Sequence, residues 1–299
     1  GTGGAAILVA VPLRECQRCR SGHACPGLHE RELCAAREVG AHAVDPRLQW
    51  QYNAESNLYS PPLVADICPN PGKEIVVSDS EARRLRCIDS TGNLVWTYSG
   101  NWKKRLASSA ALSFAAIPGK GIIAIGNGDG TLSCLDAGTG EGLWQRTPGT
   151  MEWGGALWAD LDGDGRDEVV AGTETAGIAA FDAEGAERWR YNGTGKALNI
   201  RCPLAAADID GDGKHEVFGA TRFGVLALNG DGSLRWQTDT GDDFMSSVAI
   251  ADADRDGRPE LYTASKLHSA GWCFDAATGA IGWRIPLIGG ADSYSSSCF

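Results

Sequence analysis

The chain of 299 residues lacks an apolar run long enough to cross a bilayer, because its segment AAILVAVPL is far shorter than the roughly 20 residues that a membrane helix needs. It also lacks the cationic start of a signal peptide, and it opens with Gly1 instead of Met, so we expect a mature or trimmed product. An excess of positive charge is missing too. The formal net charge of −11 argues against a nucleic-acid-binding protein.

Catalytic signatures are also scarce. None of the five histidines belongs to a Ser-His-Asp set or a Cys-His pair that stands out, so nucleophilic catalysis has no support and the sequence leans away from an enzyme. Ten cysteines in a glycine-rich chain favour an oxidising compartment, so we expect an extracellular or periplasmic, secreted protein. Asn192-Gly193-Thr194 fits a glycosylation sequon, which matters only in a eukaryotic secretory pathway.

What the chain does have is regularly spaced tryptophan. Six tryptophans recur 45 to 48 residues apart, and they close similar phrases such as LDAGTGEGLW and FDAATGAIGW. A period of this length, with short apolar strands between Gly- and Asp-rich turns, predicts a propeller in which each repeat is one small antiparallel sheet. We expect the tryptophans to pack between neighbouring sheets as core residues. They are Trp50, Trp96, Trp144, Trp189, Trp236 and Trp283.

The two ends of the chain predict how the ring closes. The C-terminal SYSSSCF looks like a first strand, AAILVAVPL like a second, and AHAVDPRLQWQY like a third and fourth. We therefore predict an all-β, single six-bladed β-propeller of four-stranded antiparallel blades, whose closing blade combines residues 1–13, 40–53 and 291–299, because closure removes exposed sheet edges. Two truncated half-blades are the alternative. A Cys-rich insertion at residues 14–39 interrupts the closing blade.

Three repeats carry an acidic loop between their first and second strands, with the sequences DLDGDGRDE, DIDGDGKHE and DADRDGRPE. Aspartates at loop positions 1, 3 and 5, a backbone carbonyl at position 7 and a glutamate at position 9 supply most of the roughly 6–8 hard oxygen ligands that calcium prefers. We predict three structural calcium sites; magnesium fits less well, and an acidic solvated turn is the alternative. The ligands are Asp160, Asp162, Asp164, Arg166 and Glu168; Asp208, Asp210, Asp212, Lys214 and Glu216; and Asp252, Asp254, Asp256, Arg258 and Glu260.

A degraded copy of the loop, ADICPNPGKE, keeps Asp66, Asn70 and Glu74 but has Cys68 at the third position. The corresponding stretch of the next repeat, SFAAIPGKG, has no acidic residue. We predict no ion at either place.

The acidic loops, set in β repeats of this length, resemble FG-GAP/VCBS repeats. The DxxTGxxxW phrase at Asp136–Trp144 and Asp275–Trp283 resembles the tryptophan-docking motif of quinoprotein-type propellers. These resemblances cover residues 45–299 and the strand at 5–13. They imply the fold and the calcium loops, but not one function, because such repeats occur in adhesins, lectins, lyases and dehydrogenases.

A ligand is expected where the repeats differ, in the segments just before each first strand. These segments surround one opening of the ring and combine aromatic, charged and amide side chains, which suits a sugar or another polar ligand; ordinary loop variation is the alternative. The candidate residues are Asn57, Tyr59, Lys104, Arg105, Glu152, Trp153, Asn199, Arg201, Asp243, Phe244 and Tyr294.

The insertion contains Cys16, Cys19, Cys25 and Cys34. We favour two disulfides that staple a long loop over a zinc or iron–sulfur site. Elsewhere, Cys87, Cys134 and Cys273 fall at one repeated strand position, which indicates small buried residues. Cys68, Cys202 and Cys298 have no partner that the sequence alone assigns.

The sequence thus favours a calcium-stabilised, extracellular binding or adhesion propeller that takes a glycan or protein ligand at the opening. Two alternatives stay open. One is an enzyme on the same scaffold, either a quinone-dependent dehydrogenase or a polysaccharide lyase in which Arg201 and Lys104 neutralise a uronate. The other is a subunit that docks a partner or transfers electrons through the Cys-rich insertion.

Overall fold

A computed structural model describes residues 7–9, 50–54, 56–195 and 198–287. Within these ranges the secondary structure consists of strands and turns, with no helix. In particular, nothing in this part of the chain forms a helix that could span a membrane.

Five four-stranded antiparallel sheets follow one another along the chain, and the strands of each sheet are paired in sequence order. Sheet 1 consists of β3 (Leu63–Ala65), β4 (Glu74–Asp79), β5 (Arg84–Ile88) and β6 (Leu94–Tyr98). Sheet 2 consists of β7 (Ala111–Ile117), β8 (Lys120–Gly126), β9 (Leu132–Asp136) and β10 (Gly142–Arg146). Sheet 3 consists of β11 (Ala156–Ala159), β12 (Glu168–Gly172), β13 (Ile178–Phe181) and β14 (Glu187–Tyr191). Sheet 4 consists of β15 (Ala205–Ala207), β16 (Glu216–Ala220), β17 (Gly224–Leu228) and β18 (Leu234–Asp239). Sheet 5 consists of β19 (Ala249–Ala251), β20 (Glu260–Ser265), β21 (Ala270–Asp275) and β22 (Ile281–Pro286).

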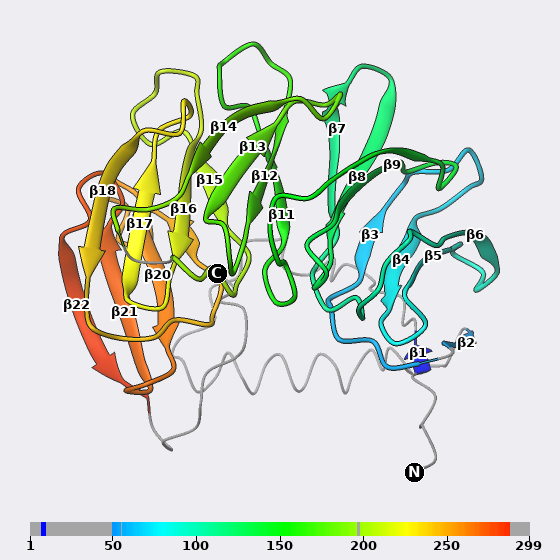
Figure 1. The fold of residues 1–299 in the computed structure, drawn as a ribbon, viewed down its shortest axis with the longest axis horizontal. Coiled ribbons are helices and arrows are strands. Elements are labelled where there is room, and N and C mark those ends of the chain that lie inside the picture. Colours follow the sequence, from blue (N-terminus) through cyan, green and yellow to red (C-terminus); the bar gives the residue numbers. More distant parts are fainter. Residues whose placement is uncertain (1–6, 10–49, 55, 196–197, 288–299) are drawn as a thin grey trace, which may run out of the picture.

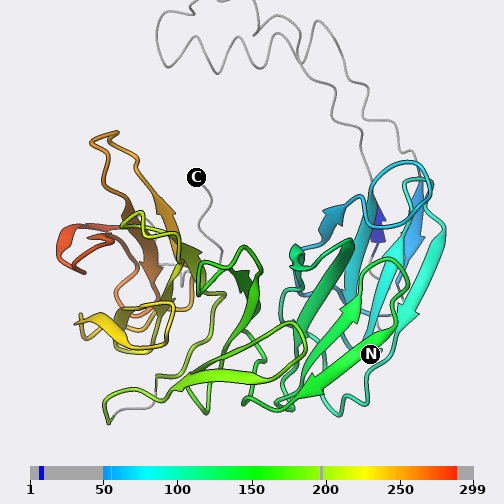
Figure 2. The same cartoon turned by 90° about the horizontal axis from the view of Figure 1, so that it is seen from above.

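The first strands of neighbouring sheets lie side by side. β11 contacts β7 and β15, and β15 contacts β19, so the first strands are innermost and the fourth strands are outermost. Seen from above, the sheets follow one another in an arc (Figure 2). This is the radial arrangement of propeller blades, as the repeat period predicts.

The burial of the strands follows their sequences. The middle strands of each sheet are short and apolar, and β12 (EVVAG) and β13 (IAAF) are buried at every position because both of their faces lie against other sheets. The outer strand β14 (ERWRY) instead exposes Glu187 and Arg188, and none of its residues is fully buried. The apolar core therefore runs through the middle of each sheet and between neighbouring sheets.

The repeated tryptophan joins each sheet to the next. Trp189 of sheet 3 donates its indole N–H to the backbone carbonyl of Gly230 in sheet 4, over 2.8 Å. Trp50, Trp96, Trp144 and Trp236 make the same bond to the following turn, over 2.7 to 2.9 Å. A glycine with positive φ faces each ring; at Gly232, a Cβ would lie only 2.5 Å from the Trp189 indole. The prediction that these tryptophans pack between blades is confirmed for all five.

At the opposite ends of the sheets, a second set of backbone bonds joins the neighbours. We call the connections that lead from each fourth strand to the next first strand the mouth loops. The Leu106 N–H, in the mouth loop before sheet 2, donates to the Ser80 carbonyl in the β4–β5 turn of sheet 1, and the bonds of Met151 to Asn127 and of Phe244 to Thr221 repeat this pattern. Because β18 and β22 run downward in Figure 1, the mouth loops lie on the lower side of that view.

The closing blade is only partly within the described residues. β1 (Ile7–Val9) pairs directly with β2 (Gln51–Asn53), whereas the sequence predicts a third strand between them. At the other end of the arc, β22 is exposed along its whole length. The insertion at 14–39 and the C-terminal strand at 291–299 lie outside the described residues, so the sixth blade and its shared closure stay predictions.

Candidate metal-binding loops and mouth of the propeller

The three acidic loops share one backbone fold, which the first aspartate of each loop organises. In the first loop the Asp160 carboxylate accepts the N–H groups of Gly163 and Gly165, over 2.8 and 2.9 Å. Asp208 and Asp252 hold their loops in the same way, through Gly211, Gly213, Asp256 and Gly257. The position-1 aspartate thus closes the turn, and the glycines adopt the positive φ that the turn requires.

The glutamate at loop position 9 begins the second strand and reaches back under the loop. Glu168 accepts the Leu161 N–H over 2.9 Å, and its side chain is almost fully buried. Around it the carboxylates gather so closely that one oxygen from each lies within 4.8 Å of the others. The three clusters are Asp160, Asp162 and Glu168; Asp208, Asp210 and Glu216; and Asp252, Asp254, Asp256 and Glu260.

Asp164 and Asp212, the position-5 residues of the first two loops, fall outside these clusters. Each accepts the N–H of the position-7 residue over 2.8 Å. Of the predicted aspartate and glutamate ligands, the structure therefore gathers four in the third loop and three in each of the other two. The role of the position-7 backbone carbonyls as ligands, those of Arg166, Lys214 and Arg258, stays a prediction.

Arginines distinguish the loops further. Arg188, just before Trp189, contacts Asp162 over 2.9 Å, and Arg235 contacts both Asp210 and Glu216, over 2.9 and 3.3 Å. In the third loop the corresponding position before Trp283 is Gly282. Among the described residues, no arginine or lysine forms an ion pair with the four clustered carboxylates of that loop. Its charge is thus the least neutralised of the three.

Burial raises the pKa of Glu168 and Glu216, and the negative charges of nearby aspartates in the same loops add to the effect. A raised carboxyl pKa means that the folded loop tolerates the ionised glutamate poorly when no cation is present. A bound divalent cation would reverse this, since it stabilises the ionised form.

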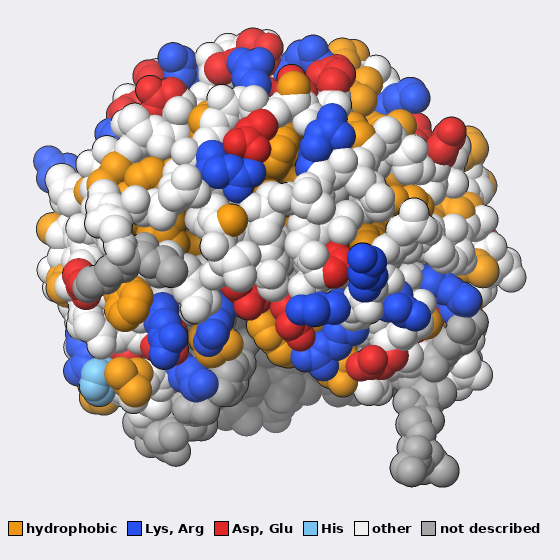
Figure 3. All heavy atoms as spheres, in the orientation of Figure 1, with side chains coloured by type: hydrophobic (Ala, Val, Ile, Leu, Met, Phe, Trp, Pro, Cys, Tyr) orange, Lys and Arg blue, Asp and Glu red, His pale blue; other side chains and the backbone are white. Residues whose placement is uncertain are grey.

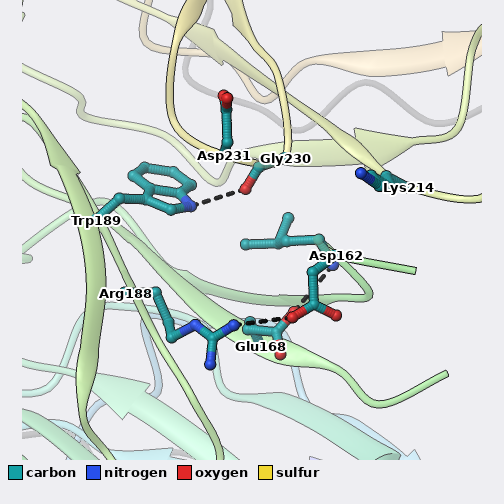
Figure 4. A pocket seen from close by; sticks show the side chains of 8 residues that line it. Asp162, Glu168, Arg188, Trp189, Lys214, Gly230 and Asp231 are labelled. Atoms are coloured by element: carbon teal, nitrogen blue, oxygen red, sulfur yellow. Dashed lines mark hydrogen bonds and ion pairs between the residues drawn. The ribbon is translucent and has the colours of Figure 1, made fainter. Parts of the chain in front are cut away.

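The first acidic loop lies at the joint between sheets 3 and 4. A pocket of about 240 Å³ beside the first loop is lined by Asp162, Glu168 and Arg188, and also by Trp189 and the sheet 4 turn at Gly230 (Figure 4). The loops of sheets 3 and 4 touch as well, because the Asp160 N–H donates to the His215 imidazole over 3.1 Å. An ion bound in this loop would therefore stabilise the contact that Trp189 makes with the next blade.

The degraded loop of sheet 1 is held by its own side chains. Glu74 accepts the N–H groups of Ile67 and Cys68 on one oxygen and the Asn70 amide on the other, over 2.8 to 3.1 Å. The Asn70 amide thus occupies one side of the carboxylate that a cation would otherwise use.

At the mouth, five predicted ligand residues from three blades come together. The Arg105 guanidinium lies over two aromatic rings, 5.4 Å from the centroid of Tyr59 and 5.2 Å from that of Trp153. Its edge is bound by Glu152 over 2.9 Å, and Asn57 donates to the Tyr59 hydroxyl over 3.2 Å. Tyr59 and Trp153 nevertheless stay 46% and 43% exposed. Acidic and basic side chains are mixed on this lower part of the surface (Figure 3).

The remaining predicted mouth residues differ in their burial and in their backbone conformation. Lys104 lies beside Glu152, since both would be 3.4 Å from a Cβ at Gly128. Asn199 has a positive φ of 52°, and Arg201 and Asp243 are partly buried. Phe244 is fully buried against Trp272, so its side chain is part of the core and does not face the opening.

Tyr294 lies outside the described residues. Glu174, which the sequence reasoning missed, accepts the Trp153 N–H over 3.3 Å from the β12–β13 turn. The topology could have indicated Glu174, because the turn between the second and third strands of a blade lies at the same end as the mouth loops.

A family model described as outer membrane protein assembly factor BamB matches residues 20–164 and 81–295. The chain belongs to this family of PQQ-like repeats. The membership covers the tryptophan-docked repeats described above, whereas the resemblance of the acidic loops to FG-GAP/VCBS repeats has no such support.

Individual relatives are more distant. The quinohemoprotein alcohol dehydrogenase of Comamonas testosteroni is 27% identical over 164 residues, which is 50% of this chain and 22% of that enzyme. The crystal structure of that enzyme has a TM-score of 0.61 at 19% identity, covering 81% of this chain and 45% of the enzyme. The chain thus spans less than half of this relative.

Two further solved structures share the fold. The Vibrio cholerae biofilm matrix protein Bap1 has a TM-score of 0.60 at 18% identity. The match covers 79% of this chain and 40% of the Bap1 chain. BamB from Moraxella catarrhalis has a TM-score of 0.57 at 20% identity, covering 80% and 68% of the two chains. At these identities the likeness concerns the propeller fold.

The described mouth residues do not fit a quinone cofactor of the kind that the dehydrogenase's name implies. A flat, polar quinone needs free hydrogen-bond donors beside the aromatic surface on which it stacks. The Arg105 guanidinium is already engaged, since it lies over the rings of Tyr59 and Trp153 and its edge is bound by Glu152. We therefore derive no reaction through such a group.

Proposed function

We propose that this protein is a calcium-stabilised binding propeller of the cell envelope or the extracellular space, and that it holds a protein partner at its mouth. The observation that carries the proposal is the exposed stack of Tyr59, Arg105 and Trp153. Aromatic residues and arginine dominate binding hot spots, because they offer large, rigid contact areas together with polar edges. The stack is built before any partner arrives, so little side-chain entropy is lost on binding.

A protein partner fits better than a glycan for two reasons. The family description names an assembly factor for proteins. In addition, the ion pair of Arg105 with Glu152 already satisfies the strongest hydrogen-bonding groups of the stack, so its aromatic surfaces are what remains to be covered. A sugar would need more unpaired donors and acceptors at the centre of the site.

A photo-crosslinking side chain at position 153 tests the partner. We expect it to capture one defined protein in the native cell. The same group at Phe114, which is 57% exposed on a different part of the propeller, serves as the control and should not capture that protein. Trp153→Ala should weaken binding of the captured protein at least about tenfold, because a hot-spot aromatic contributes about 2 kcal/mol or more. Glycan-array binding that depends on Trp153, without any protein capture, would replace this proposal with a carbohydrate ligand.

Calcium is expected to bind most tightly at the third loop, where four carboxylates gather and none of the described arginines pairs with them. Saturating calcium should then raise the midpoint of thermal unfolding, since a ligand at about 100 times its Kd stabilises the folded state by about 2.7 kcal/mol. Asp254→Asn should remove most of the rise. Asp182→Asn is the matched control, because Asp182 only caps the turn of sheet 3. A rise of the same size in Asp254→Asn protein would show that the ion binds elsewhere.

The effect of calcium should shrink on acidification. In the metal-free fold the pKa values of Glu168 and Glu216 lie above the ordinary value of 4.5, so the folded state binds protons more readily than the unfolded chain. Metal-free stability therefore falls as the pH rises through this range, while protons compete with calcium as the pH falls. Thermal unfolding with calcium and with a chelator, from pH 7 down to about pH 5, should show converging midpoints. A calcium effect that stays constant over this range would contradict the assignment of the two glutamates as ligands.

A dehydrogenase is the second candidate function, because of the 27% identity to the Comamonas enzyme. Reduction of a dye by alcohol after quinone and calcium are added would support it. Crosslinking at position 153 without any such activity favours the binding function.

A further inference from the structure

Two cysteines meet in sheet 1. Cys68 lies in the degraded acidic loop and Cys87 on β5; each thiol is close enough to affect the pKa of the other, and both are free thiols in this structure. Both side chains are buried, at 7% and 0% exposure, and belong to the same apolar cluster. The Cys68 thiol also donates to the Gly138 carbonyl in the next blade, over 3.4 Å. The loop, the third strand and the blade joint therefore converge at this point.

The repeats show why the two positions face each other. Cys87, Cys134 and Cys273 occupy the same register on the third strand, directly opposite the docking tryptophan of the fourth strand. In sheet 5 the position-3 aspartate of the loop, Asp254, lines the same pocket as Cys273. In sheet 1 the residue at that loop position is Cys68. The blade geometry thus places position 3 of the loop over the third strand, and in sheet 1 this brings two thiols together.

We propose that Cys68 and Cys87 form a disulfide, which ties the loop of the first blade to its third strand at the place where sheets 3, 4 and 5 carry an acidic cluster. Each thiol loses its proton, one S–S bond forms, and the two electrons reduce the disulfide of an exchange partner to two thiols. That partner is an oxidised dithiol protein or a small disulfide such as oxidised glutathione, as found in the compartments where secreted proteins fold.

A metal ion is the other way to use this pair, and the surrounding groups disfavour it. Among the described residues, Cys68 and Cys87 belong to no cluster of three or more converging ligands. Glu74, an acid of the same loop, already accepts two backbone N–H groups and the Asn70 amide. Two thiols with no third ligand match a disulfide better than a metal site.

The timing of oxidation follows from burial. Burial raises the pKa of both thiols, so the folded, reduced protein contains little of the thiolate that attacks a disulfide. We therefore expect the bond to form during folding. Oxidised glutathione added to folded, reduced protein should act slowly, whereas its presence during refolding should give the bond efficiently.

The test uses the full chain, expressed in an oxidising compartment, unfolded and alkylated without reductant, and then mapped by mass spectrometry. We expect one cross-linked peptide pair, two hydrogens lighter than the sum of its reduced parts, that joins Cys68 to Cys87. Cys134 and Cys202, which are equally buried, should be alkylated and serve as internal controls. Alkylation of both Cys68 and Cys87 would overturn the proposal, as would a bond from either of them to another cysteine.

Variants add a second readout. Cys68→Ser, Cys87→Ser and the double variant should all lower the midpoint of thermal unfolding of oxidised protein by the same amount, about 5–10 °C. The effects should not add, because each change removes the same bond. Under reductant, the single variants should differ little from reduced wild-type protein. Additive losses that persist under reductant would instead indicate two independent packing defects.

Discussion

Trp236→Ala is expected to lower the free energy of unfolding by about 3–5 kcal/mol, the usual cost of truncating a buried tryptophan. The side chain is only 9% exposed, packs 6.2 Å from Phe218, and donates its indole N–H to Ala276 of the next blade over 2.9 Å. Its loss leaves a cavity and an unpaired carbonyl at the joint between sheets 4 and 5. Equilibrium unfolding in denaturant measures the change.

Trp283→Ala is the matched control. Trp283 occupies the same position in sheet 5, but it is 43% exposed and its described ring contact is with Tyr262 of its own sheet. We expect a loss of about 1 kcal/mol or less, because an exposed side chain gives up little buried area. Equal losses in the two variants would mean that the Trp236 joint contributes nothing special to stability.

Gly140→Ala should be almost as damaging, although it adds a single carbon. Gly140 has a φ of +71°, and a Cβ there would lie 2.6 Å from the Trp96 indole, well inside van der Waals contact. The left-handed backbone costs an alanine about 1–2 kcal/mol, and overpacking typically adds about 1–3 kcal/mol. Thermal and denaturant unfolding should both report a loss of about 2–5 kcal/mol.

Gly119→Ala separates the two causes. Gly119 has a similar φ of +77°, but a Cβ there would meet nothing within 4 Å. We expect only the backbone term, about 1–2 kcal/mol. If the two alanine variants are equally destabilised, the close approach of the tryptophan ring has no energetic importance.

The sequence predicts the blades well because their determinants are local. A glycine lies four residues before Trp96, Trp144, Trp189, Trp236 and Trp283, and it is enough to predict the turn between the third and fourth strands. In the structure, the tryptophan of the preceding blade packs directly on that glycine. The acidic loops are predictable for the same reason. Their hydrogen bonds run between residues a few positions apart, such as Asp160 and Gly165.

Features that depend on contacts between distant residues were not predictable. The ion pair of Arg188 with Asp162 joins residues 26 positions apart, and no pattern in either segment indicates it. Phe244 stands among polar mouth residues in the sequence, yet it packs inward because the neighbouring Trp272 provides an apolar surface. The direct pairing of β1 with β2 also depends on distant segments, and local strand signals do not specify partners.

Because each tryptophan belongs to one repeat and its glycine to the next, every stretch of 45 to 48 residues carries one half of two different joints. Such a stretch can be duplicated or removed by recombination at almost any point, and the new neighbours still match. Blade number can therefore drift during evolution without new interfaces being invented, while loops at either end diversify independently.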